Sequence, residues 1–283
     1  MPASMRLSQA PLIHVVAQVH FSEVPPYEEA ALNQLHRSLM SAGYPERLNG
    51  HLEEVEWSFE MSDGASPKQR KRRFPRFVFK GPGQRRLVEL RHNCLIFKVT
   101  DYSGHQTFLS EWNEVMGLVS SVIPEMTNAL LHSLSLRYVD LVVPKERETL
   151  RELVSVALLP PPLPDVDGNA LFGSTLKAFD TGDGRHLRVT FEEIQPQRQR
   201  LTKILPDDLI EQVPEFGLSI DGLPHWQVVH GAYGLLDIDH VYTASNTPAV
   251  GDCEMPDIFR KLHEQTHKAF WGLISQQAIE SWE

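Results

Sequence analysis

The chain has 283 residues, 41% of them hydrophobic and 23% charged, which is the composition of a folded globular protein with one large core or two modest ones. Its formal charge is −10, and its two cysteines, Cys94 and Cys253, have neither metal-ligand spacing nor the density of a disulfide framework. No apolar run approaches the roughly 20 residues that span a bilayer, and the first residues lack the apolar core of a secretory signal, so we expect a cytoplasmic protein with no membrane partner.

The first half of the chain predicts a strand, a helix, an antiparallel meander and a second helix. Residues 11–21 are rich in β-branched side chains, and an amphipathic helical pattern follows from Tyr27 to Gly43. Alternation of apolar and polar residues then predicts strands at 55–61, 74–79 and 86–100. A second helix is expected at 107–123, with Trp112 on its buried face, and it should end before Pro124.

The second half repeats this order. It predicts a strand at 130–143 and a short helix at 146–158, followed by loops at 160–170 and 195–224. The remaining predicted elements are strands at 176–179, 187–194 and 225–242 and a long helix at 255–282. We therefore expect an α+β fold of two similar lobes, 8–127 and 128–283, each an antiparallel sheet with packed helices, and a long C-terminal helix.

Four segments carry a resemblance to a known family: 11–21, 134–140, 235–239 and 262–282. Together they are similar to sporadically distributed bacterial proteins of about this length, which have no assigned activity and often lie in mobile or defence-related gene neighbourhoods. In that family, acids commonly occupy the positions that match His14 and Gln18, and a basic residue matches His20. The resemblance implies a cytoplasmic accessory or defence-associated protein, and it transfers no catalytic residues.

The most informative feature is a basic segment, residues 68–98. Eleven Lys and Arg residues against the single acid Glu89 give it a formal charge of +10, so the rest of a chain with a total of −10 carries −20. Clustered exposed charge of one sign attracts a partner of the opposite sign, most often phosphate or an acidic surface. The residues expected to form this partner surface are Lys68, Arg70, Lys71, Arg72, Arg73, Arg76, Lys80, Arg85, Arg86 and Arg91.

Residues 68–76 are interpreted as a loop that enters a strand, so that the charge gathers at one end and edge of a hairpin. Phe74, Phe77 and Phe79 alternate with the basic residues. In sequence-tolerant binding of single-stranded nucleic acid, cations follow the phosphates and aromatic rings stack on the bases. The alternative is that Phe77 and Phe79 point to the core, while the basic residues pair with acids elsewhere in the chain or with an acidic partner protein.

A second motif, His263-Glu264-Gln-Thr-His267, matches the H-E-x-x-H pattern on a predicted helix. Two imidazoles one turn apart could hold zinc while the glutamate activates water. The motif lacks an evident third ligand and has charged neighbours, which favours a surface helix with a partly buried His263. The metal site stays as the alternative.

Asp237 and Asp239 alternate in a strand pattern and therefore share one face, where two carboxylates could bind Mg²⁺. The simpler interpretation is a solvated face, with Leu236 and Ile238 directed inward. Arg137 and Asp140 have odd spacing and face opposite sides of their strand, so Arg137 could instead form a structural ion pair with an acid on a neighbouring strand.

The glycine-rich turns at 81–83 and 182–184 lack the context of a phosphate-binding loop, and no nucleophile motif occurs. No cofactor is therefore predicted, and the oligomeric state is left open. The sequence favours a non-enzymatic binding or accessory protein of bacterial defence or mobile-element biology, whose basic hairpin binds nucleic acid or an acidic protein surface. The alternative is a metal-dependent hydrolase built on His263, Glu264 and His267 or on Asp237 and Asp239.

Overall fold

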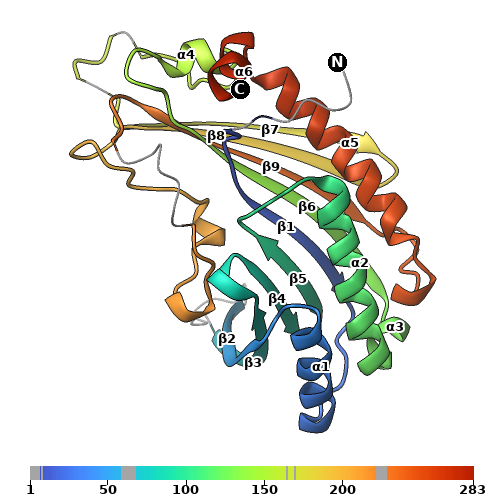
Figure 1. Cartoon of the computed structure of the whole chain (residues 1–283). Coiled ribbons are helices and arrows are strands. Elements are labelled where there is room, and N and C mark those ends of the chain that lie inside the picture. The colour runs from blue at the N-terminus through green and yellow to red at the C-terminus, as the bar shows by residue number, and fades with distance from the viewer. Residues whose placement is uncertain (1–6, 8, 59–67, 164, 169, 221–227) are drawn as a thin grey trace, which may run out of the picture.

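A computed structural model of the chain describes residue 7 and residues 9–58, 68–163, 165–168, 170–220 and 228–283. The described strands form one antiparallel sheet in the order β2-β3-β4-β5-β1-β6-β9-β8-β7 (Figure 1). Their bounds are β1 Leu12–Phe21, β2 Glu46–Ser58, β3 Lys68–Lys80, β4 Arg86–Arg91, β5 Cys94–Val99, β6 Leu131–Val142, β7 Phe172–Gly182, β8 Arg185–Ile194 and β9 Tyr233–Thr243.

Three long helices pack against one face of this sheet. The described α-helices are α1 Glu29–Ser41, α2 His105–Val122, α3 Pro124–Asn128, α4 Leu150–Leu153, α5 Met255–Leu273 and α6 Gln276–Trp282. Figure 1 shows α1, α2 and α5 on the same side of the strands. Their apolar stripes meet alternate residues of the central strands in the main core, where Trp112, Leu262 and Val15 are almost completely buried. This apolar layer forms because apolar residues repeat with the helical period in the helices and at every second position in the strands.

Each half of the chain contributes one side of the sheet. The half before residue 128 supplies β2-β3-β4-β5-β1, the half after it supplies β6-β9-β8-β7, and the two meet where β1 pairs with β6. The α+β class and the antiparallel strands are confirmed. The halves share one continuous sheet, and their division into two lobes stays a prediction.

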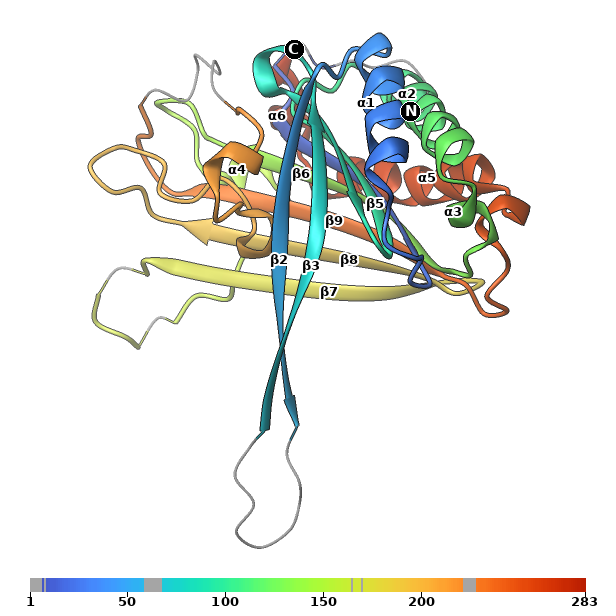
Figure 2. The ribbon, with the colours of Figure 1, turned by 90° about the horizontal axis from the view of Figure 1, so that it is seen from below.

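The strands β2 and β3 extend beyond the rest of the sheet. Strand β4 pairs with residues 76–80 of β3, whereas residues 68–75 pair with residues 51–58 of β2. These two segments, 51–58 and 68–75, form a two-stranded ribbon that projects from the body in Figure 2 and that we name the β2–β3 arm. The β2–β3 ladder holds the arm together, and Figure 2 shows the described helices away from it.

Residues 195–220 cover part of the sheet face opposite the helices. Leu205 and Leu209 of this segment pack on apolar residues of the central strands, and Phe216 packs further along between Val78 and Leu87. At Gly50, a Cβ atom would lie 2.5 Å from the Phe216 ring, so a side chain there would displace it. The covering segment therefore runs from the second half of the sheet to the base of the arm.

Several predicted boundaries are corrected. Strand β2 begins at Glu46, nine residues before the expected start, and its predicted end at 59–61 lies outside the described residues. The strand expected at 86–100 is two strands, because the chain turns at His92 and Asn93. The basic residues 68–76, expected to be a loop, are part of β3.

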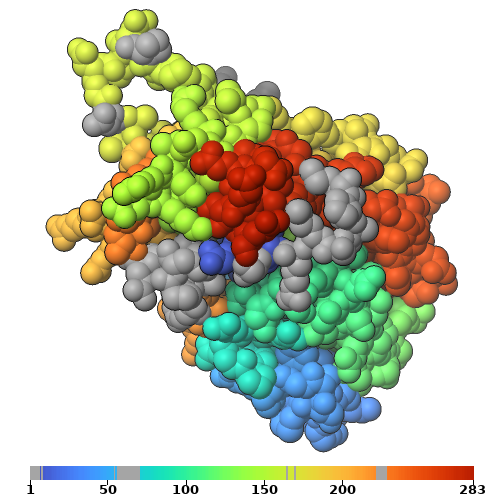
Figure 3. All heavy atoms as spheres, turned by 45° about the horizontal axis from the view of Figure 1, so that its top comes forward, coloured from blue at the N-terminus to red at the C-terminus, as the bar shows by residue number. Residues whose placement is uncertain are grey.

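The two helices predicted in the second half are shorter than expected. The capping box of Thr149 and Glu152 begins α4, which has only four residues. The long C-terminal helix is interrupted at Ile274, which bridges Val154, and the Ser275 side chain then caps α6. Figure 3 shows the red C-terminal residues on the surface beside the lime segment that contains α4. Among the described helices, none combines the length and apolar character needed to cross a membrane.

Candidate functional site

The acid within the basic segment, Glu89, is buried and forms ion pairs with several basic side chains. Arg91 Nε lies 2.6 Å from one carboxylate oxygen of Glu89, while Arg76 Nη2 and Lys98 Nζ lie 3.0 Å and 3.6 Å from the other. Burial by itself would raise the pKa of Glu89, but the charges of Lys98, Arg91 and Arg76 hold it below its ordinary value. We name these four residues the Glu89 cluster. Three of the eleven basic residues are therefore engaged inside the protein.

Arg76 also ties the arm's base to the covering segment. Its guanidinium donates to Glu211 at 3.2 Å and 2.9 Å and lies 4.6 Å from the centre of the Phe216 ring. Burial would lower the pKa of Arg76, but its bonds with Glu211 and the charge of Glu89 raise it. The side chain is only 4% exposed, so it is not available to a partner.

Two more of the predicted contact residues are held by the body. Lys80 is 1% exposed, and its ammonium donates to the backbone oxygen of Glu215 at 2.5 Å; burial lowers its pKa. Arg86 is half-buried between Asp101, at 3.1 Å, and Glu111. Arg85 is exposed beside the turn after β3, where its carbonyl accepts from the Thr100 amide. The expected single surface is therefore corrected, because Arg76 and Lys80 lie inside and Arg86 and Arg91 form internal ion pairs.

The exposed basic residues that remain together are Lys71, Arg72 and Arg73 on the arm. The side chains of Lys68 and Arg70 lie outside the described part of the structure. The register places Glu53 opposite Arg73 and Glu54 opposite Arg72. With five basic residues and three acids, the arm has a formal charge of +2, far below the +10 of the whole segment.

The aromatic residues of β3 are also partly engaged. Phe79 is buried in the core, and Phe77 lies against Tyr27 and beneath the Arg47 guanidinium. The Phe74 ring stacks on His92 with 4.3 Å between ring centres. These rings are therefore not positioned to stack on nucleic-acid bases. The alternative interpretation, in which Phe77 and Phe79 face inward, describes them better.

The His263 motif lies on α5, where its side chains have separate partners. His263 Nδ1 is 2.9 Å from the Tyr138 hydroxyl, and its ring stacks on His105 with 3.7 Å between centres. His267 Nε2 accepts from the Trp271 indole, while Glu264 pairs with Arg260. Burial, helped by the neighbouring histidines, lowers the pKa of His263 to about 3. This arrangement matches the partly buried His263 of the simpler interpretation.

The face that carries Asp237 is not solvated, which corrects the simpler interpretation of this pair. Asp237 is 5% exposed and accepts from Arg137 Nε at 2.7 Å, while Asp208 of the covering segment accepts from the same guanidinium at 2.6 Å. Asp239 pairs with Arg188 at 3.2 Å. A cation therefore already occupies the space between these acids. The structural ion pair considered for Arg137 is confirmed.

The described residues contain no group of three or more His, Cys, Asp and Glu side chains that could hold a metal ion. Neither set of alternative ligands, on α5 or on β9, is thus gathered into a metal site in this part of the chain. Cys94 is buried, and burial raises the pKa of its thiol to about 12, which disfavours a reactive thiolate.

Two buried ionisable groups stand out beside these networks. Asp140 is 2% exposed on β6, and burial, together with the charge of Asp237, raises its pKa to about 8. His14 is 4% exposed on β1, and neither ring nitrogen has a hydrogen-bond partner among the described residues. Burial, with the charges of Lys98 and Arg137, lowers the pKa of His14 to about 3. Both side chains are therefore largely neutral at pH 7.

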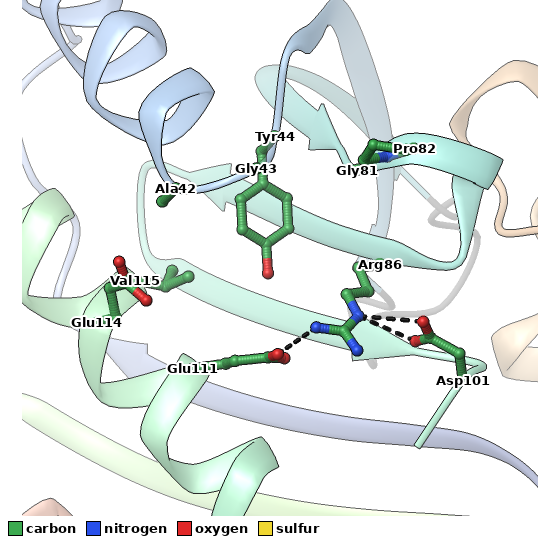
Figure 4. Close-up of a pocket in the computed structure, with 10 residues that line it drawn as sticks. All are labelled: Ala42, Gly43, Tyr44, Gly81, Pro82, Arg86, Asp101, Glu111, Glu114 and Val115. Carbon is green, nitrogen blue, oxygen red and sulfur yellow. Dashed lines mark hydrogen bonds and ion pairs between the residues drawn. The ribbon is translucent and has the colours of Figure 1, made fainter. Parts of the chain in front are cut away.

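A cavity of about 370 Å³, which no sequence motif indicated, lies between α1, α2 and the start of β4 (Figure 4). Its polar lining comes from Tyr44, Arg86, Asp101, Glu111 and Glu114. These residues belong to separate segments, and Tyr44 appeared only as part of a helix exit. No local pattern could have found the site, because the sheet brings its walls together.

Comparison of the chain with models of known protein families and with curated proteins finds no match.

Proposed function

We propose that the protein is a non-enzymatic binding or accessory component that engages an acidic surface of a partner protein through the β2–β3 arm. One observation carries this proposal. Lys71, Arg72 and Arg73 are exposed on a ribbon that projects from the sheet, whereas other basic residues of the same segment are bound internally (Figure 2). A projecting ribbon can contact a partner without displacing any part of the core.

The charge of the arm supports a protein partner. Each of its three acids, all on β2, lies opposite a basic residue of β3 in the register. The formal charge of the arm is only +2, in a chain of charge −10. Long-range attraction of a polyanion depends on net charge, whereas an acidic protein surface can be matched residue by residue. The arm is therefore better suited to short-range ion pairs than to neutralising a row of phosphates.

Nucleic acid is the second candidate, and the shape of the arm favours it. The major groove of B-DNA is about 12 Å wide and admits a two-stranded β-ribbon. The arm is such a ribbon, and three consecutive basic residues, 71–73, are exposed on it. In this second candidate, the arm binds in the groove of duplex DNA, in place of the stacking on single-stranded bases that the sequence suggested.

The broader role rests on the resemblance of the opening strand and the three later segments. We propose a cytoplasmic accessory protein of bacterial defence or mobile-element biology, as that resemblance implies. We also propose that 8–127 and 128–283 are two related lobes, since each contains a strand, a helix, further strands and a long helix.

The test reverses three charges on the arm, with Lys71, Arg72 and Arg73 each replaced by Glu. Three exposed basic residues elsewhere, Arg37, Arg151 and Lys268, receive the same change in a matched control that shifts the net charge equally. Binding is measured by capture from nuclease-treated host extract, and by titration with poly-glutamate and with a DNA duplex. We expect the arm variant to lose at least tenfold in affinity while the control retains binding.

The salt dependence separates the two partners. Duplex binding should weaken with a log–log slope of about −0.9 for each phosphate neutralised, and a protein partner should show a shallower dependence. Equal binding by the folded arm variant and the wild type would remove the arm from partner recognition.

A further inference from the structure

The cavity of Figure 4 lies at the opposite end of β3 from the arm. Its walls are Ala42, Gly43 and Tyr44 after α1, the turn at Gly81 and Pro82, and three segments that carry charged groups (Figure 4). At about 370 Å³, it falls within the usual range of roughly 300–1,000 Å³ for small-molecule sites.

The lining is strongly acidic. Asp101, Glu111 and Glu114 bring three carboxylates, against which Arg86 brings one positive charge. Arg86 is already shared between Asp101, at 3.1 Å, and Glu111. Glu114 is exposed at the rim and makes no ion pair with the described residues. The site therefore has a formal charge of −2, with a carboxylate at its rim available to a ligand.

Tyr44 provides a second and independent sign of a ligand. The residue is 5% exposed, and Figure 4 shows its ring directed into the cavity with the hydroxyl toward Glu111 and Arg86. No hydrogen bond joins this hydroxyl to any described residue. Burial, with the charge of Glu111, raises the pKa of Tyr44, so the group stays a neutral hydroxyl that can accept a hydrogen bond. The hydroxyl oxygen opens into the cavity, where a ligand or water can complete its hydrogen bonding.

The end of α1 adds to the negative potential. The carbonyl end of a helix carries a partial negative charge, which favours a cation within about one turn. The last turn of α1 contains no basic residue, and its C-cap residue, Ala42, lines the cavity. The helix end and the carboxylates therefore favour the same sign of ligand charge.

We infer that the cavity beside Tyr44 binds a small organic cation whose primary ammonium or guanidinium group meets Glu114, Glu111 and the Tyr44 hydroxyl. An N–H cation can donate to both carboxylates and to the hydroxyl, which matches the acceptors present. A bare metal ion fits less well, because the Arg86 guanidinium already lies among the carboxylates. The cation belongs either to a free amine or to a lysine or arginine side chain of a peptide, and the two share this chemistry.

The experiment titrates the full-length protein by calorimetry with three probes. Putrescine and agmatine represent free amines, and a short peptide with one central lysine and blocked termini represents a protein side chain. Diacetylated putrescine, which has no charge, is the probe control. We expect saturable binding of at least one cationic probe and none of the uncharged one; the class that binds identifies the source of the cation.

Two conservative variants locate the site. Glu114→Gln removes one charge from an exposed position and should weaken binding by about tenfold, since 1.4 kcal/mol corresponds to a factor of ten. Tyr44→Phe removes only the hydroxyl and should weaken binding severalfold. Glu146→Gln, at an exposed position after β6, is the matched control and should bind as the wild type does.

Thermal unfolding verifies that each variant is folded. The arm variant with Lys71, Arg72 and Arg73 reversed should retain amine binding, so this inference does not depend on the proposed function. Absence of binding by every cationic probe, or equal binding by the wild type and both cavity variants, would overturn the inference.

Discussion

The β2–β3 arm and the Glu89 cluster contain the same kinds of residue from one basic segment, yet they have different physical roles. In the arm, Lys71, Arg72 and Arg73 are exposed, and water screens their charges. In the Glu89 cluster, Arg76 and Glu89 are almost completely buried and depend on each other. The comparison teaches that a run of basic residues can be exposed at one end and bound into the internal structure at the other.

The largest expected effect comes from breaking the Glu89 cluster. Glu89→Gln would leave Arg76, Arg91 and Lys98 without their shared carboxylate, and removing one member of a buried ion pair typically costs about 3–5 kcal/mol. Denaturant unfolding at pH 7 measures this loss. Because the pKa of Glu89 is lowered on folding, its contribution exists above the ordinary value of 4.5 and fades as the pH falls below it.

The control for this change is Glu53→Gln on the arm, which faces Arg73 in the register. An exposed ion pair contributes at most about 1 kcal/mol. Equal losses for Glu53→Gln and Glu89→Gln would contradict the distinction between the two regions.

A smaller effect of opposite sign is expected at Asp140, a buried acid of the body that forms no ion pair with the described residues. Its folded pKa is about 8 and its ordinary value is 3.8, so folding is penalised increasingly as the pH rises from 3.8 to 8. Asp140→Asn should therefore raise the free energy of unfolding by roughly a few kcal/mol above pH 8, with little difference near pH 3.8. Unfolding curves of both proteins across this window test the sign; parallel pH profiles would show that Asp140 titrates normally.

His14, a second buried group of the body, is expected to affect stability at acid pH. Its folded pKa is about 3 and its ordinary value is 6.5, so the unfolded chain takes up a proton first and stability falls as the pH drops from 6.5 to 3. His14→Leu should remove roughly a few kcal/mol of this acid sensitivity. His263 and His105 have lowered pKa values as well, so part of the loss should remain in the variant. An unchanged pH profile would place His14 in contact with water.

The smallest expected effect belongs to the arm itself. Reversing Lys71, Arg72 and Arg73 should change the free energy of unfolding by no more than about 0.5 kcal/mol for each residue, since exposed positions rarely contribute more. The same denaturant measurement verifies it. A loss comparable to that of Glu89→Gln would mean that the arm's charges also stabilise the fold.

Local sequence patterns predicted the elements that have strong periods. The β-branched run at 11–21 is β1, and the helical stripe at 107–123 is α2, with Trp112 fully buried as expected. These predictions succeed because the period of apolar residues depends only on neighbours along the chain. The prediction for 255–282 did not find the break at Ile274, because a contact with Val154, more than a hundred residues away, extends the chain there.

The candidate site was harder to predict than the elements. The basic segment was visible as composition, but its division into an exposed arm and buried pairs depends on Glu211, Glu215 and Asp101, which other segments supply. The cavity residues Tyr44 and Glu114 had no signal of their own, since each belongs to an ordinary helix or helix exit.

The sequence by itself determined the α+β class, most of the strands and helices, and the presence of a local charge of +10. The tertiary structure alone decided which of those charges stay exposed and which meet Glu89, because burial and ion pairing depend on the strands that lie side by side. Charge is a property of each residue, whereas its exposure is a property of the assembled sheet. That difference in physical origin separates the arm from the Glu89 cluster.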